Sequence, residues 1–141
     1  MMEKNTARIL EELKMCEEFK TFYNENDEHM IKESLADMLN AVIIRKGLKK
    51  VDLIANSEIS EVYVYQILSG RRLPERNKLI CLILAMHIEI DEVQKILRCA
   101  GYSPLYAKIP FDSIILYAIC KKLSVVETNA LLFENLGQTL G

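Results

Sequence analysis

The sequence predicts an all-α protein, and three observations support this fold class. Apolar residues recur at intervals of three and four residues along almost the whole chain. No long segment alternates between apolar and polar residues, as a half-buried strand would. Glycine and proline are scarce, at 5 and 3 of 141 residues, which favours helices over a turn-rich β architecture.

The N-terminal part of the chain contains two expected helices. The first runs from about Thr6 to Tyr23 and ends at the polar cluster 24–28. A second helix begins either near this cluster or at Ser34, where Ser34 and Asp37 form a weak capping signal, and it ends at Gly47. The first helix has an apolar stripe formed by Ile9, Leu10, Leu13, Cys16, Phe19 and Tyr23.

Four further helices are expected in the middle of the chain. Two short ones span Lys49 to about Ser57 and Ser60 to about Ser69. A longer helix opens at Pro74-Glu75 and continues through His87, and a short one covers Asp91 to Ala100.

A linker and a helical hairpin complete the chain. The linker runs from Ser103 to Pro110, and the arms of the hairpin cover about Asp112 to Lys121 and Val125 to Leu136. Ser124 and Glu127 have the spacing of a capping box at the start of the second arm.

Charge is distributed unevenly along this slightly acidic chain, whose net charge is −2. Residues 45–78 contain eight basic and four acidic side chains, a balance of +4, whereas the remainder carries ten basic and sixteen acidic side chains, a balance of −6. Such a basic block is compatible with a local DNA footprint, and an ordinary mixed surface is the alternative.

Several other classes of protein are disfavoured. The four cysteines are scattered singly through helical patterns, as expected for reduced, buried thiols in a cytoplasmic protein. No apolar run is long enough to cross a membrane, and the N-terminus lacks the apolar core of a secretory signal. The two histidines have no partner at metal-ligand spacing, and no catalytic motif is present. We therefore expect neither an enzyme nor a protein with a metal or other cofactor.

The short helix 60–69 has two distinct faces when its residues are placed at 100° intervals. One face is apolar and combines Tyr63, Val64, Ile67 and Leu68. The other mixes hydrogen-bonding groups with one small hydrophobic residue: Glu61, Val62, Tyr65, Gln66 and Ser69. Because a helix this short is unstable alone, its apolar face must rest on neighbours. The expected supports are Leu48, Leu53, Ile54 and Ile59.

The segment GLKKVDLIANSEISEVYVYQILSGRRLP resembles the helix-turn-helix of the lambda-repressor and Cro class, the Xre-type family of bacterial regulators. The matching positions lie in register without a gap: Gly47, Leu48, Leu53, Ile59, Ser60, Val64, Ile67, Gly70, Arg72 and Pro74. The resemblance implies a lambda-repressor-like five-helix core at residues 31–100, an N-terminal helical extension at 1–30, and a C-terminal helical hairpin at 101–141 packed on the core.

The segment departs from the class pattern at three positions. Glu58 occupies a turn position usually held by glycine, and a left-handed backbone there would cost on the order of 1 kcal/mol. Ile54 replaces a small alanine, so the two helices would pack less closely. Lys50 replaces a glutamine that often holds a phosphate, a role that a lysine can fill as a point charge.

In this class the second helix of the motif enters the major groove of DNA. Gln66 would then form a bidentate contact with adenine, or remain a solvent-facing polar residue. Val62 would contact a thymine methyl group, and Tyr65 a phosphate or the groove wall. Glu61 would either accept from cytosine N4 or stabilise the start of its helix. Phosphate contacts would come from Lys49, Lys50, Ser60, Arg71, Arg72, Arg76 and Lys78, and for the cations among them solvated surface charge is the alternative.

The resemblance thus implies a sequence-specific transcriptional regulator that binds double-stranded DNA as a homodimer, through the N-terminal helix or the C-terminal hairpin. The alternative is a protein-interaction adaptor that keeps the fold without reading DNA. Its partner would bind the C-terminal hairpin at Ile114, Ile115, Val125, Leu131 and Leu132, for which burial in the core is the competing expectation.

Overall fold

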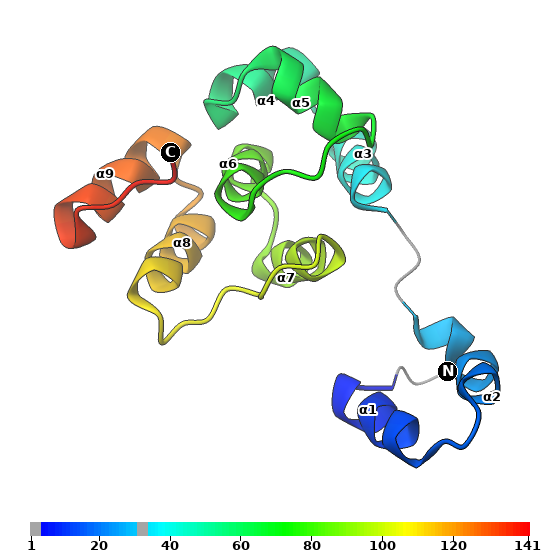
Figure 1. Cartoon of the computed structure of the whole chain (residues 1–141). Helices are drawn as coiled ribbons and strands as arrows, with labels where there is room; N and C mark the ends of the chain where they lie inside the picture. Colours follow the sequence, from blue (N-terminus) through cyan, green and yellow to red (C-terminus); the bar gives the residue numbers. More distant parts are fainter. Residues whose placement is uncertain (1–3, 31–33) are drawn as a thin grey trace. The chain divides into compact units, whose positions relative to one another are not determined.

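A computed structural model describes residues 4–30 and 34–141, and throughout these residues the regular structure is helical (Figure 1). The predicted all-α class is confirmed. The chain divides into an N-terminal unit, Met1–Lys32, and a C-terminal unit, Glu33–Gly141. The domain boundary predicted after residue 30 falls at residues 31–33, which lie outside the described part of the chain.

The N-terminal unit contains two helices where the sequence predicted one. Helix α1 covers Thr6–Met15, helix α2 covers Phe19–Asn26, and a 3-10 turn, η1, follows at Asp27–His29. The prediction of a continuous helix is wrong because the backbone is extended at Cys16 (φ −74°, ψ 144°). The break lets α2 fold back against α1, which buries Phe22, whereas Leu10, Leu13, Phe19 and Tyr23 of the predicted apolar stripe remain exposed.

The C-terminal unit is organised around a central helix, α6, at Arg76–Met86. All eight residues from Leu79 to Met86 are buried, so this helix is covered on every side. Helices α4 (Lys50–Ser57), α7 (Ile90–Cys99) and α9 (Val125–Leu136) pack against it. Figure 1 shows α6 between the α3–α5 group and the C-terminal hairpin.

Local end signals fix the first and last helices of this unit. Helix α3 covers Leu35–Lys46, with the Ser34 hydroxyl accepting from the Asp37 amide at 3.1 Å and Gly47 in a left-handed conformation. The capping box predicted at the start of α9 is confirmed, with both of its hydrogen bonds present. These results confirm the predicted ends of both helices.

The C-terminal hairpin consists of α8 (Pro110–Lys121) and α9, which pack against each other and against α7 and α6 respectively. Of the apolar residues considered for partner binding, Ile115, Val125 and Leu132 are buried, and the other two are half-buried. Core burial, the competing expectation for these residues, is therefore confirmed for Ile115, Val125 and Leu132, which cannot serve as an exposed surface. Within the described residues, no helix is both long and apolar enough to cross a membrane.

Candidate functional site

The site predicted from the sequence lies on α4 and on α5 (Glu61–Leu68), which are joined by the residues 58–60. Glu58 ends α4 in a left-handed conformation (φ 61°), and Ser60 begins α5 by accepting from the Tyr63 amide at 3.3 Å. The side chain of Asn40 on α3 donates to the carbonyl oxygen of Leu68 at 2.8 Å. Hydrogen bonds thus fix the start of α5, directly after the turn, and its C-terminal end.

Helix α5 has the two faces that its sequence predicted. Val64, Ile67 and Leu68 are buried in the core. Beneath them lie Leu53 and Ile59, which are buried, and Leu48 and Ile54, which are partly buried. The predicted supports are confirmed.

The opposite face of α5 carries all four side chains predicted to read bases. Glu61 is exposed, Val62 is 66% exposed and Tyr65 is 44% exposed, whereas Gln66 is half-buried. Because a surface valine with two-thirds of its area in water has no role in the core, this face is open to a partner. On the same face, the Lys50 ammonium group of α4 lies 5.8 Å from the centre of the Tyr65 ring.

A compact cluster follows the C-terminal end of α5. The Arg72 guanidinium lies over the Tyr63 ring, 4.1 Å from its centre, and donates from Nη1 to Gln66 Oε1 at 3.2 Å. The Tyr63 hydroxyl accepts from the Glu75 amide at 3.2 Å, which holds the ring in place. The sequence predicted Tyr63 for core packing, and its ring is indeed half-buried, but its contact with Arg72 was not predicted.

Arg76 is engaged within the protein. Its guanidinium donates to both carboxylate oxygens of Asp112, at 3.4 and 3.3 Å, and to the carbonyl oxygen of Ser103. Asp112 is only 3% exposed and also accepts from the Tyr106 amide at 3.0 Å. This group ties α6 to α8, whereas the phosphate contact predicted for Arg76 would require these donors to turn outward.

Two other cations of the basic block also have partners. Arg45 forms a bidentate ion pair with Glu92, and the arginine holds the pKa of this carboxyl below its usual value. The Lys46 ammonium donates to the carbonyl oxygens of Met86 and His87 at the end of α6, at 2.9 and 2.6 Å. The exposed cations beside the α4–α5 pair are Lys49, Lys50, Arg71 and Arg72.

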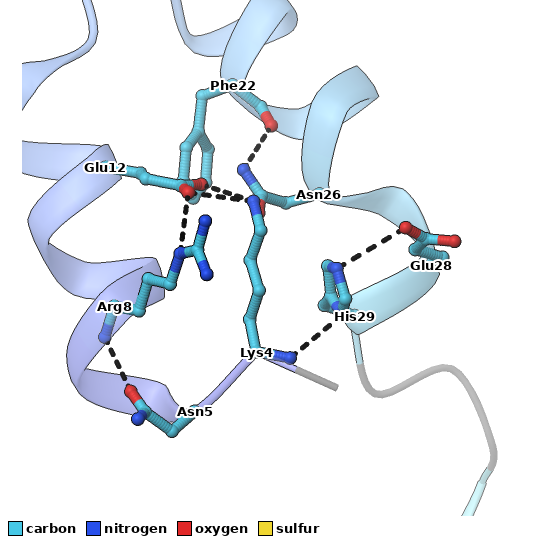
Figure 2. A network of polar contacts seen from close by, with 8 residues as sticks. All are labelled: Lys4, Asn5, Arg8, Glu12, Phe22, Asn26, Glu28 and His29. Carbon is cyan, nitrogen blue, oxygen red and sulfur yellow. Dashed lines mark hydrogen bonds and ion pairs between the residues drawn. The ribbon is translucent and has the colours of Figure 1, made fainter. Parts of the chain in front are cut away.

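The N-terminal unit contains a polar network that the sequence did not predict (Figure 2). The Lys4 ammonium lies 2.8 Å from both carboxylate oxygens of Glu12 and 2.8 Å from Oδ1 of the buried Asn26. The hydrogen bond from Lys4 is the main cause that lowers the pKa of Glu12. Asn26 also donates to the carbonyl oxygen of Phe22 at 3.0 Å. The network ties α1 to the end of α2, and no local sequence signal relates residues so far apart.

An open cleft of about 530 Å³ lies beside this network in the N-terminal unit. It is lined by Glu12, Met15, Cys16, Glu17, Glu18, Thr21, Phe22 and Glu25. In the described ranges 4–30 and 34–141, no group of three histidine, cysteine, aspartate or glutamate side chains could hold a metal ion.

Comparison of this chain with protein-family models, with curated proteins and with solved structures gave no match.

Proposed function

We propose that helices α3 to α7 form a lambda-repressor-like helix-turn-helix domain and that the protein is a sequence-specific, DNA-binding transcriptional regulator. The observation that most supports this proposal is the outward face of α5. There, the Lys50 ammonium group of α4 lies near the Tyr65 ring, and the Arg72 guanidinium, which follows α5, is bonded to Gln66. An exposed helix face with cations against it fits the major groove, where base edges lie between two phosphate backbones.

In the proposed complex α5 lies in the major groove of double-stranded DNA. Lys49, Lys50 and Arg71 would contact phosphates, and the exposed Ser60 would add a hydroxyl at the groove edge. Val62 would contact a thymine methyl group. The exposed Glu61 lies in the first turn of α5, where its carboxylate is stabilised by the helix dipole whether or not it accepts from a cytosine.

The regulator would act as a homodimer in the cytoplasm, without a cofactor, on a two-fold symmetric site. Two copies of a short reading helix provide the contact area and the phosphate contacts that one copy lacks.

Selection of bound sequences from a random double-stranded DNA pool, followed by titration of the recovered sequence, tests the proposal. Replacing Lys49 with alanine should weaken binding to all sequences alike and make the dependence of log K on log salt shallower by about 0.9 for each lost phosphate contact. Val62→Ala should instead change the base preference at one position. Lys108→Ala serves as the control, because this exposed lysine lies in the segment between α7 and α8. Failure to enrich any sequence at low salt would refute the proposal.

A second candidate function is that of a protein-interaction adaptor, and the C-terminal hairpin favours it. Tyr117, Val126 and Phe133 are 52%, 61% and 66% exposed, so this hairpin presents apolar area other than the residues predicted from the sequence. Capture of one stoichiometric protein by the wild-type chain, lost in Phe133→Ser, together with no enrichment of DNA, would favour the adaptor. Unchanged capture by Phe133→Ser would exclude this surface as the binding site.

A further inference from the structure

The position of Arg72 gives the proposed DNA interface a more specific chemistry. Its guanidinium is stacked on Tyr63 and bonded to Gln66 Oε1, and its backbone amide donates to the Gln66 carbonyl oxygen at 3.2 Å. Two hydrogen bonds thus join Arg72 to Gln66, the half-buried residue among the four on the outward face of α5. The Arg72 guanidinium therefore lies beside Gln66, a side chain predicted to read a base.

The contact determines which end of the Gln66 amide is available. A guanidinium has only donors, so the amide group that faces it must be the oxygen. The amide NH₂ group of Gln66 therefore faces away from Arg72. The groups that this pair can still offer are mainly donors, the NH₂ of Gln66 and the remaining N–H groups of Arg72, against one remaining lone pair on the Gln66 oxygen.

We infer that Gln66 and Arg72, supported by Tyr63, form one reading unit that selects guanine. This inference rests on the proposed DNA-binding function and specifies its ligand. Guanine presents two acceptors, N7 and O6, in the major groove, which match a pair of donors. Adenine presents an acceptor beside an N6 donor, and that donor would have to share the amide oxygen that already accepts from Arg72. The expectation of adenine from Gln66 alone is thereby replaced by guanine.

The same contacts assign separate roles to the three residues. Arg72 supplies charged donors, whose hydrogen bonds to a base acceptor are stronger than those of a neutral amide. Gln66 supplies a neutral donor and aligns the guanidinium. Tyr63 is a positioning residue, since its ring supports the guanidinium while its hydroxyl is bonded to the Glu75 amide.

The test begins with selection from a random DNA pool and then measures binding by fluorescence anisotropy. For the wild type we expect guanine at the position contacted by this unit. Replacing that guanine with 7-deazaguanine, which lacks the N7 acceptor, should weaken binding about 10-fold. Replacing the G·C pair with A·T should weaken binding by about 5- to 150-fold, the range for one bidentate base contact.

Substitutions then separate base reading from a general loss of charge. In Arg72→Ala the Gln66 amide is released, so the preference at this position should change from guanine to adenine. Arg71→Ala removes the same charge one residue away and should weaken binding to both sequences equally. Tyr63→Leu should reduce the guanine preference, and Tyr63→Phe, which keeps the ring, should retain it. Thermal unfolding of each variant shows whether the fold is intact.

The outcomes distinguish the inference from the function on which it rests. If no sequence is enriched, the proposed DNA-binding function is wrong. If a specific sequence is enriched but the base preference of Arg72→Ala equals that of Arg71→Ala, the protein reads DNA and the reading unit inferred for Gln66 and Arg72 is wrong. A change of preference from guanine to adenine in Arg72→Ala, and not in Arg71→Ala, supports the inference.

Discussion

Substitution of Glu58 by glycine should stabilise the C-terminal unit. Glu58 ends α4 with φ 61° and ψ 22°, in the left-handed region that side chains with a Cβ atom rarely adopt. It is one of three such non-glycine residues in the described part of the chain, with His87 and Lys122. The side chain of Glu58 is exposed and forms no ion pair in that part, so its removal sacrifices no such contact.

The size of the effect follows from two opposing contributions. The left-handed conformation costs a residue with a Cβ atom about 1–2 kcal/mol. Glycine avoids this cost but loses about 0.5–1 kcal/mol more conformational freedom on folding. The free energy of unfolding should therefore rise by about 0.5–1 kcal/mol in Glu58→Gly. With a urea dependence of about 2 kcal/mol per molar, this is a midpoint shift of about 0.3–0.5 M.

Urea unfolding followed by circular dichroism measures this shift, and Glu58→Ala is the matched control. Alanine removes the carboxylate but keeps the Cβ atom, so it should retain the conformational cost and gain little stability. A midpoint for Glu58→Gly at or below that of the wild type would contradict the strain argument. An equal gain in Glu58→Ala would instead assign the effect to charge, because both variants lack the carboxylate.

Three further predictions concern Asp112, His87 and Cys81. Asp112→Asn should lower the free energy of unfolding by about 1–3 kcal/mol in urea titrations, because Arg76 loses its carboxylate partner; an unchanged midpoint would contradict this. Burial, Lys46 and Lys122 lower the pKa of His87, so the unfolded state binds more protons below about pH 6.5 and stability should decrease toward pH 5.5. His87→Asn should lose less stability over this interval, since asparagine does not titrate and tolerates a left-handed backbone; equal losses would refute the assignment. Burial raises the pKa of the Cys81 thiol to about 11, so iodoacetamide at pH 8 should modify it far more slowly than the exposed Cys120, as read by mass spectrometry of the folded protein; equal rates would contradict its burial.

Helix ends in the C-terminal unit were predictable because their signals are local. Ser34 and Ser124 each bond to an amide three residues later, and Gly47 supplies the left-handed ending of α3. Such contacts depend on a few consecutive residues and on backbone geometry. The two faces of α5 were predictable for a similar reason, since the helical period alone separates buried Val64 and Ile67 from the outward side chains.

The features that were not predicted depend on contacts between distant residues. The break at Cys16 has no proline or glycine to mark it, and its advantage arises only when α2 folds back on α1. Lys4 meets Asn26 across 22 positions, and Arg76 meets Asp112 across 36. Periodicity and end signals contain no information about such pairs, because they describe each element separately.

The structure also changes how the basic block supports the proposed function. Counting charges in the sequence treats all eight cations alike, yet Arg72 is bonded to Gln66 within the proposed interface, and three others, Arg45, Lys46 and Arg76, are bonded to groups elsewhere in the protein. These three would have to give up their partners before binding a phosphate, so they weaken the argument from net charge. The exposed cations that remain next to the α4–α5 pair lie at the start of α4 and directly after α5. Two of these cations contact the outward face of α5, Lys50 at Tyr65 and Arg72 at Gln66, and these contacts support DNA binding more directly than the excess of positive charge does.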